Sequence, residues 1–258
     1  MTGRLTVIGL GPGAEELQTP QAKAALEAAT DLFGYTTYLD RVPLRPDQTR
    51  HGSDNREELD RARAALTLAY TGNNIAIVSS GDSGVFAMAA AVFEAIETGE
   101  PAWREIEVTV VPGISAMFAA AARLGAPLGH DFCAISLSDN LKPWETVTRR
   151  LKAAAEADFV IALYNPISKA RRWQLGAAFD LLREVHGPET PVVFATAVSR
   201  ADEEIEFTTL ADADPSRADM RTLVMIGSSA TRLVARPDGG AWVYTPRRAD
   251  QPTGEFVS

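Results

Sequence analysis

Cysteine is almost absent from this chain of 258 residues, where it occurs once, at Cys133. A disulfide within the chain is therefore impossible, which fits a reducing cytoplasm. Histidine is nearly as rare, and His51, His130 and His186 stand far apart, without the spacing of metal ligands. We therefore expect no metal ion bound by the protein.

The sequence also lacks a long apolar run and an excess of basic residues. No run approaches the ~20 apolar residues that cross a bilayer. At the N-terminus, Arg4 is followed by a short apolar run and then by glycines, unlike a signal peptide. We therefore expect a cytoplasmic protein with no membrane partner. The formal net charge of −9 argues against a nucleic-acid partner, although local arginines can still hold a small polyanion.

The pattern that is present predicts an α/β protein. Hydrophobic residues make up 46% of the chain and charged residues 23%, as in globular proteins with a core. Short apolar runs alternate with helical stretches, which predicts a largely parallel sheet covered on both faces. The predicted strands are Leu5–Leu10, Asn74–Ser79, Glu107–Val111, Cys133–Leu137, Phe159–Tyr164, Val192–Thr196 and Thr222–Ile226. The predicted helices begin at Thr19-Pro20 and continue with Glu57–Ala69, Phe86–Glu97, Ala116–Leu124, Pro143–Ala157 and Arg171–Val185.

The length of 258 residues suits one large domain or two smaller ones. A segment rich in Ala and Gly, which also contains Pro127, separates two stretches of alternating strands and helices. We predict an N-terminal α/β domain at residues 1–114, a connecting segment at 115–132, a C-terminal α/β domain at 133–247 and a polar tail at 248–258.

The first glycine loop, GLGPGA at residues 9–14, formally satisfies the dinucleotide fingerprint G-x-G-x-x-G/A. That fingerprint requires a helix to start at the loop, so that its amides face a pyrophosphate. Here Pro12 lacks an amide donor, and the helix signal starts only at Thr19-Pro20. Asp31 follows the loop at about the sequence spacing of a ribose-binding acid, but a single acidic residue can match that spacing by coincidence. A nicotinamide or flavin site, a structural turn and a different cofactor loop remain open.

Two further loops follow predicted strands, SSGDSG at residues 79–84 and PGISA at 112–116. Their glycines let a ligand approach the backbone, and Asp82 offers a carboxylate where open α/β sheets bind ligands. Helix capping is the structural alternative for Asp82 and for Ser115. A nucleophile elbow is excluded because Val85 stands where glycine is needed. None of the three loops carries a Walker lysine, so together they favour a small neutral or cationic ligand.

The loops GLGPG, GDSG and PGIS, in this order and spacing, resemble the tetrapyrrole methyltransferases, which use S-adenosylmethionine. Segments of the second half resemble members that methylate precorrin-3B at ring carbon 17, with ring contraction to precorrin-4, in vitamin B12 biosynthesis. These segments are DFCAISLSDNLKPWE (131–145), ADFVIALYNPISKARRWQL (157–175) and DMRTLVMIGSSATR (219–232). The resemblance covers roughly residues 4 to 247. It implies a homodimer of two-domain α/β chains, with the active site and the methyl donor in the cleft between the domains.

Carried over motif by motif, the resemblance implies donor contacts from both halves of the chain. These are Pro12, Ser80, Gly81, Asp82, Val85, Ser115, Ala116, Asn165, Ala197 and Val198. Relatives often have Gly where Ser80 stands, Thr where Ser115 stands and Met near Asn165. This chain therefore departs from the common pattern at three of the implied contacts.

Methyl transfer from a sulfonium is an in-line displacement by an activated donor, so the protein mainly supplies proximity, orientation and exclusion of water. Asp82 and nearby carbonyls complement a cationic donor. Ring contraction needs a hydroxyl proton to be removed, so a general base is expected. The candidate catalytic residues are Asp82, His51, His130 and Asp139, each with a structural alternative.

A precorrin-type substrate carries acetate and propionate groups, which require cationic anchors. The candidates are Arg50, Arg56, Lys142, Lys169, Arg171, Arg172 and Arg200, with a solvated charged face as the alternative. We assign Trp144 and Trp173 to the core or to an interface rather than to stacking on the ring. Four other functions stay open: methylation of cobalt-factor III, methylation of another precorrin, nicotinamide oxidoreduction and tetrapyrrole transport.

Overall fold

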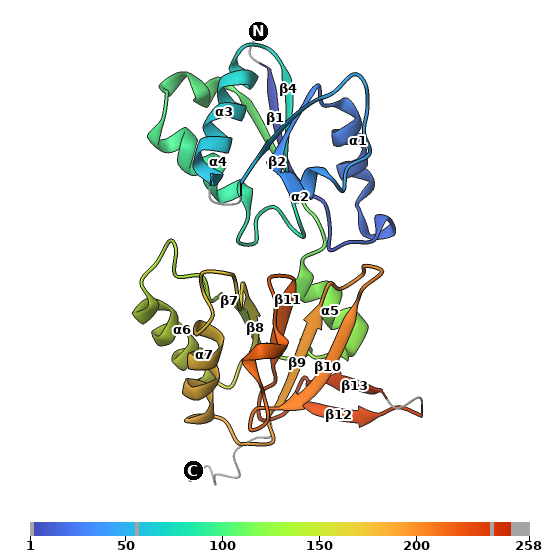
Figure 1. Ribbon diagram of the computed structural model, residues 1–258, viewed down its shortest axis with the longest axis vertical. Coiled ribbons are helices and arrows are strands. Elements are labelled where there is room, and N and C mark those ends of the chain that lie inside the picture. Colours follow the sequence, from blue (N-terminus) through green and yellow to red (C-terminus); the bar gives the residue numbers. More distant parts are fainter. Residues whose placement is uncertain (1–2, 55–56, 238–239, 249–258) are drawn as a thin grey trace, which may run out of the picture. The chain divides into compact units, whose positions relative to one another are not determined.

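The computed structural model describes residues 3–54, 57–237 and 240–248, and the chain divides into two compact units between Ala116 and Met117 (Figure 1). The predicted connecting segment 115–132 holds helix α5 (Ala116–Leu124) and strand β6 (Gly125–Ala126). The substrate candidate Arg56 and residues 249–258 of the predicted tail lie outside the described residues. No helix in the described ranges is long and apolar enough to cross a membrane.

The first unit contains a five-stranded sheet in the order β3-β2-β4-β1-β5, in which every pair of neighbours is parallel. The strands are β1 (Arg4–Gly9), β2 (Asp31–Tyr35), β3 (Thr49–Ser53), β4 (Asn74–Ser79) and β5 (Glu107–Val111). The helices are α1 (Pro20–Ala28), α2 (Thr36–Leu39), α3 (Glu58–Tyr70) and α4 (Met88–Thr98), with short 3₁₀ turns η1 (Glu15–Leu17) and η2 (Pro101–Glu105). Three of these strands match the prediction to within a residue, whereas β2 and β3 were not predicted.

Both faces of this sheet are buried, as the continuous apolar run in β4 predicts. Ile75 and Ile77 belong to the core formed with α3 and α4. Ala76 and Val78, on the opposite face, belong to the core formed with α1 and α2. Helices therefore cover both faces of this sheet (Figure 1).

The predicted start of α1 is confirmed. The Thr19 hydroxyl accepts a hydrogen bond from the Ala22 N–H at 3.1 Å, and Pro20 is the first helical residue. Only the short turn η1 lies between β1 and this helix. The helix N-terminus is therefore displaced from the first glycine loop by several residues.

The second unit contains a five-stranded sheet in the order β10-β9-β11-β8-β7. Its strands are β7 (Phe132–Ser136), β8 (Val160–Tyr164), β9 (Pro191–Thr196), β10 (Glu204–Thr209) and β11 (Thr222–Ile226). Strands β7 and β8 are parallel, but β11 is antiparallel to β8 and β9, and β10 is antiparallel to β9. The expectation of a largely parallel sheet is thus confirmed for the first unit and wrong for the second. Residues 197–203, between β9 and β10, are too few for a crossover, so the pair forms a hairpin.

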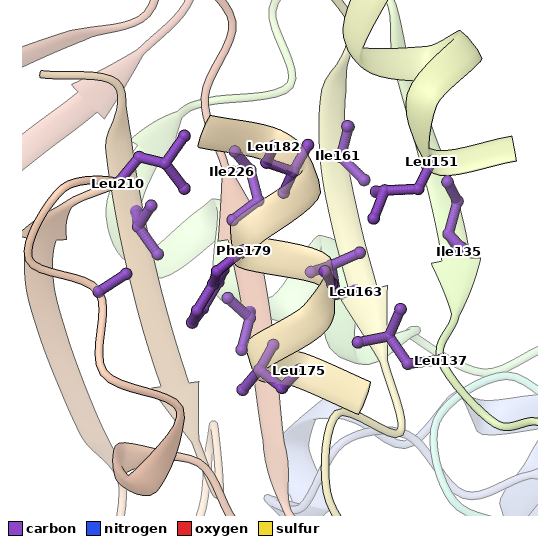
Figure 2. Close-up of a cluster of buried hydrophobic side chains, with 14 of the residues drawn as sticks. Ile135, Leu137, Leu151, Ile161, Leu163, Leu175, Phe179, Leu182, Leu210 and Ile226 are labelled. Atoms are coloured by element: carbon purple, nitrogen blue, oxygen red, sulfur yellow. The ribbon is translucent and has the colours of Figure 1, made fainter. Parts of the chain in front are cut away.

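Helices α6 (Trp144–Glu156) and α7 (Gln174–Arg183) cover one face of this sheet (Figure 2). Phe179 on α7 is fully buried and meets Phe194 edge-on at 6.1 Å between ring centroids. Truncation of such a side chain to alanine costs about 3–5 kcal/mol of stability. The unit also contains the 3₁₀ turn η3 (Pro215–Arg217) and a small sheet of β12 (Arg232–Ala235), β13 (Ala241–Tyr244) and β6.

Candidate functional site

The three glycine loops leave the same edge of the first sheet. Strand β1 lies between β4 and β5, and all three are parallel, so their carboxyl ends are neighbours. Beyond the strands, the Leu10 N–H donates to the Ser79 carbonyl at 2.9 Å. Gly11 and Gly81 then exchange backbone hydrogen bonds at 3.0 and 2.9 Å. The first and second loops are therefore joined by their backbones.

Glycine is required at this edge for two different reasons. Gly11 and Gly81 have φ of 71° and 66°, in the left-handed region that side chains rarely adopt. At Gly113, an added Cβ would lie 2.2 Å from the Gly81 carbonyl oxygen and 2.7 Å from that of Gly9. The third loop therefore packs backbone to backbone against the other two.

Asp82 joins the second loop to the third. Its Oδ2 accepts a hydrogen bond from the Gly113 N–H at 3.0 Å, and its Oδ1 accepts one from the Gly84 N–H at 2.8 Å. At the start of α4 it is the Ser79 hydroxyl that accepts from the Met88 N–H, at 3.3 Å. The carboxylate of Asp82 thus organises the loops and does not cap this helix.

Arg41 is a residue of this site that the sequence reasoning missed. It follows α2, and its guanidinium donates to the Ser80 hydroxyl and the Gly11 carbonyl, each at 2.9 Å, and to the Leu10 carbonyl at 3.4 Å. The neighbouring elements β2, α2 and β3 were not predicted either. No local motif marks this arginine, because its role depends on how α2 returns toward the loops.

His51 is not brought to the loops. Its Nε2 lies 2.8 Å from Asp31 Oδ1, and its ring stacks on Phe33 with 4.2 Å between centroids. Asp31 begins β2, so the pair lies toward the amino ends of the strands, opposite the glycine loops. In a dinucleotide site, the ribose-binding acid stands at the carboxyl end of its strand, whereas Asp31 stands at the amino end of β2. Neither Asp31 nor the displaced start of α1 therefore supports a nicotinamide site.

Arg50 is used within the fold. Its guanidinium donates to the carbonyls of Leu39 and Val42, at 2.9 and 2.5 Å, where α2 ends.

In the second unit, His130 precedes β7 and lies 3.8 Å from the Asp131 carboxylate. His130 is therefore at the amino end of its strand, away from the edge where β7 and β8 end.

Strands β7, β8 and β9 run in one direction, so they end at one edge of the second sheet, which holds the remaining predicted residues. Asn165 follows β8 and Ala197 follows β9, with φ of 52° and 49°. The Asn165 amide donates to the Ser136 hydroxyl at 2.9 Å. Asp139, after β7, accepts from the Gln174 amide at 3.0 Å. Val198 is buried beside Ala197.

Four predicted cations lie on loops at this edge. Arg171 donates to the Asn165 carbonyl at 3.0 Å, and burial lowers its pKa, an effect that Asp139 partly offsets. Burial and then the charge of Arg150 lower the pKa of Lys142. Lys169 and Arg172 are exposed.

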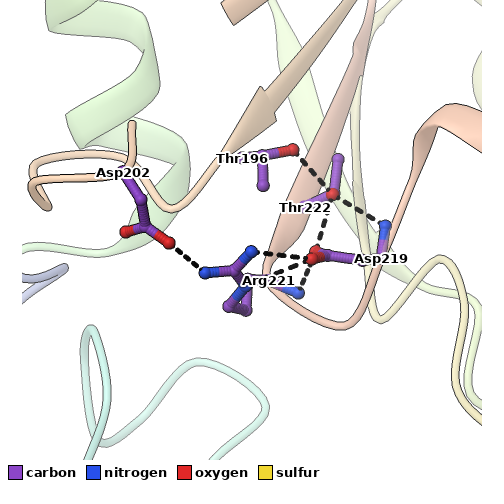
Figure 3. A network of polar contacts seen from close by, with 5 residues as sticks. All are labelled: Thr196, Asp202, Asp219, Arg221 and Thr222. Atoms are coloured by element: carbon purple, nitrogen blue, oxygen red, sulfur yellow. Dashed lines mark hydrogen bonds and ion pairs between the residues drawn. The ribbon is translucent and has the colours of Figure 1, made fainter. Parts of the chain in front are cut away.

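Arg200 stands in the turn after β9. A polar network holds this turn against the start of β11 (Figure 3). Thr222 Oγ1 lies 2.8 Å from Thr196 Oγ1 and donates to Asp219 Oδ1 at 3.0 Å. Arg221 pairs with Asp219 and with Asp202. The hydrogen bond to Arg221 lowers the pKa of Asp202, but both groups are exposed and the pair contributes little to stability.

The described residues include no group of three or more His, Cys, Asp and Glu side chains that could hold a metal ion. The loops offer glycine backbone, hydroxyls and one carboxylate, and their Arg41 cation is directed at loop oxygens. Fold and loops together define a two-unit α/β protein with strand-end loops suited to a small cofactor without phosphate.

The chain belongs to the family of tetrapyrrole (corrin/porphyrin) methylases, whose model matches residues 4–214. It is 60% identical over 247 residues to a precorrin-3B C(17)-methyltransferase of Sinorhizobium sp, covering 96% of this chain and 97% of that protein. It is 43% identical to a probable cobalt-factor III C(17)-methyltransferase of Salmonella typhimurium, covering 88% and 93%.

Solved structures agree with this assignment. The methyltransferase CobJ superposes with a TM-score of 0.91 at 52% identity, over 95% of this chain and 100% of that one. A uroporphyrin-III C-methyl transferase from Thermus thermophilus, complexed with S-adenosyl homocysteine, superposes with a TM-score of 0.67 at 22% identity, over 87% and 97%. The second likeness shows a shared fold.

Proposed function

We propose that this protein transfers a methyl group from S-adenosylmethionine to ring carbon 17 of precorrin-3B and contracts the ring to give precorrin-4, in vitamin B12 biosynthesis. The observation that carries this proposal is the 60% identity to a precorrin-3B C(17)-methyltransferase over nearly the whole of both chains. CobJ, a relative with a solved structure, is also a methyltransferase.

The loop chemistry supports S-adenosylmethionine as the cofactor. When bound, it supplies a methyl group already activated on a sulfonium. The residues proposed to hold it are Pro12, Ser80, Gly81, Asp82, Val85, Ser115 and Ala116 in the first unit, and Asn165, Ala197 and Val198 in the second. At Gly81 an added Cβ would have no atom closer than 3.7 Å, so ligand atoms can approach this backbone. The carboxylate of Asp82 complements the positive charge of the donor.

The basic residues at the edge of the second sheet are proposed to bind the carboxylates of the macrocycle. Lys142, Lys169, Arg171, Arg172 and Arg200 remain candidates. Arg50 is a weaker candidate, because its guanidinium is used by two carbonyls of the fold. For the general base we favour Asp139 and Asp82, because His51 is paired with Asp31 at the start of β2 and His130 precedes β7.

One incubation tests the proposal. The protein, precorrin-3B and S-adenosylmethionine are combined, and the product is followed by mass and absorbance. A single added methyl with ring contraction, together with stoichiometric S-adenosylhomocysteine, is the expected result. Binding of the macrocycle without S-adenosylhomocysteine would instead make the protein a tetrapyrrole carrier and overturn the proposal.

Methylation of cobalt-factor III is the second candidate, because a relative bearing that activity in its name is 43% identical over most of both chains. The higher identity to the precorrin-3B enzyme favours the metal-free substrate. Competition between the two substrates in one reaction measures the preference directly through the ratio of kcat/KM values. A ratio that favours the cobalt-containing ring would reverse our choice.

We further propose that the protein is a cytoplasmic homodimer and that its domains are residues 1–114 and 133–247. Exposed apolar side chains on the small sheet support a dimer, since Leu233, Val234, Trp242 and Tyr244 are each more than 40% exposed. Light scattering after size-exclusion chromatography measures the mass, and a mass of one chain would contradict the dimer.

A further inference from the structure

We propose that Arg41 is a positioning residue for the methyl donor: it clamps the first and second glycine loops in the geometry that binds S-adenosylmethionine. This inference rests on the proposed function. It concerns a residue outside the glycine loops and all the implied donor contacts, on the segment between β2 and β3.

The position of Arg41 lets one side chain reach two loops. Strand β2 neighbours β4, which neighbours β1, and α2 follows β2 directly. From the end of α2, the guanidinium reaches Ser80 in the loop after β4 and Gly11 in the loop after β1, each at 2.9 Å. A planar guanidinium presents its donors in a rigid fork, so these two bonds add a side-chain link to the backbone bonds that already join Gly11 and Gly81.

The atoms that Arg41 holds adjoin the proposed donor contacts. Ser80 is itself one of them, and the Gly11 carbonyl belongs to the peptide that leads into Pro12. That carbonyl accepts from both Arg41 and the Gly81 N–H at 2.9 Å, which uses both of its lone pairs. Loss of the guanidinium therefore removes one of the two hydrogen bonds to the Gly11 carbonyl and the bond to the Ser80 hydroxyl, without removing any donor contact.

The link between Arg41 and the second loop depends on both Arg41 and Ser80, because the Ser80 hydroxyl accepts the hydrogen bond. In this chain, Ser80 and Arg41 are expected to act together, so their substitutions are expected to be non-additive.

The test measures S-adenosylhomocysteine binding by calorimetry, for the unmutated protein and for Arg41→Ala, Arg41→Lys and Ser80→Ala. Hydrogen bonds to a charged group are strong enough that Arg41→Ala should raise Kd by roughly 10- to 100-fold. Arg41→Lys keeps the charge without the fork, and Ser80→Ala removes one acceptor, so both should have smaller effects. The double variant Arg41→Ala/Ser80→Ala should bind S-adenosylhomocysteine more tightly than expected from adding the binding free energies that the two single variants lose.

Arg45→Ala is the matched control, because Arg45 lies on the same segment and forms a surface pair with Asp47. It should leave Kd unchanged. Free guanidinium at millimolar concentration should restore part of the affinity of Arg41→Ala. With precorrin-3B, the KM for the donor should rise while the KM for the macrocycle stays constant.

Unchanged donor affinity in Arg41→Ala would overturn the inference. A Kd change that appears only together with a lower unfolding midpoint, and that guanidinium does not reverse, would also overturn it in favour of a purely structural role. Failure of the unmutated protein to bind S-adenosylhomocysteine is a separate result, which would overturn the proposed function and the inference with it.

Discussion

Replacement of Asp82 by alanine is expected to destabilise the first unit as well as the donor site. The substitution removes the acceptors of the Gly113 N–H and the Gly84 N–H. A bond to a charged acceptor contributes about 1.5–3 kcal/mol when shielded, and less at the surface. The bond to Gly113 is partly buried and the bond to Gly84 is exposed, so the expected loss of unfolding free energy is about 2–3 kcal/mol.

Urea unfolding followed by circular dichroism measures this loss, and hydrogen exchange locates it, because protection of the Gly113 amide should fall. Asp82→Asn keeps one acceptor oxygen and should lose about 1–2 kcal/mol. Asp47→Ala, which removes a surface partner of Arg45, is the control and should leave the unfolding curve unchanged. The donor should bind Asp82→Ala more weakly by a further ~1–3 kcal/mol, measured by calorimetry. Unfolding within about 0.5 kcal/mol of the unmutated protein, with Gly113 still protected, would refute the reasoning.

Three further predictions concern other parts of the chain. Arg50→Ala should lower the unfolding free energy by about 1–3 kcal/mol, because the carbonyls of Leu39 and Val42 lose their donor. The KM for the macrocycle should not change, and a raised KM would show that Arg50 anchors the substrate. Ala197→Gly should raise the stability by about 0.5–1 kcal/mol in thermal unfolding, because it relieves a φ of 49°, and a lower midpoint would show that the side chain is needed there. Burial raises the pKa of the Cys133 thiol to about 11, so the thiol stays protonated below that pH. Iodoacetamide should therefore label native Cys133 slowly at pH 8 and faster as the pH approaches 11, and rapid labelling at pH 8 would contradict the burial.

Strands β4 and β3 show why one strand can be predicted from its local sequence and another cannot. Strand β4 contains the continuous apolar run IAIV because both of its faces are buried. Strand β3, TRHGS, is an edge strand without a buried residue, so neither its composition nor its alternation marks it as a strand. Such a segment becomes a strand because β2 offers hydrogen bonds, which is tertiary context that the local sequence does not contain.

The candidate site divides in the same way. Gly11, Gly81 and Asp82 could be predicted because they follow apolar strands within short motifs. Arg41 could not, since the guanidinium acts on oxygens that lie about 30 or more positions away in the chain. His51 and His130 were proposed as bases on residue type alone, which carries no information about the end of the strand on which a side chain lies.

The backbone contacts among Gly9, Gly81 and Gly113 also bear on how quickly and how tightly a cofactor is bound. The three loops are joined by main-chain contacts and by the carboxylate of Asp82, so the protein's own bonds hold them in place. Ordering loops upon association normally costs affinity, and a site that is already formed avoids that cost. We therefore expect donor association with a single kinetic phase, limited by encounter rather than by loop rearrangement, and with backbone positions at this edge that hardly change between the free and bound protein.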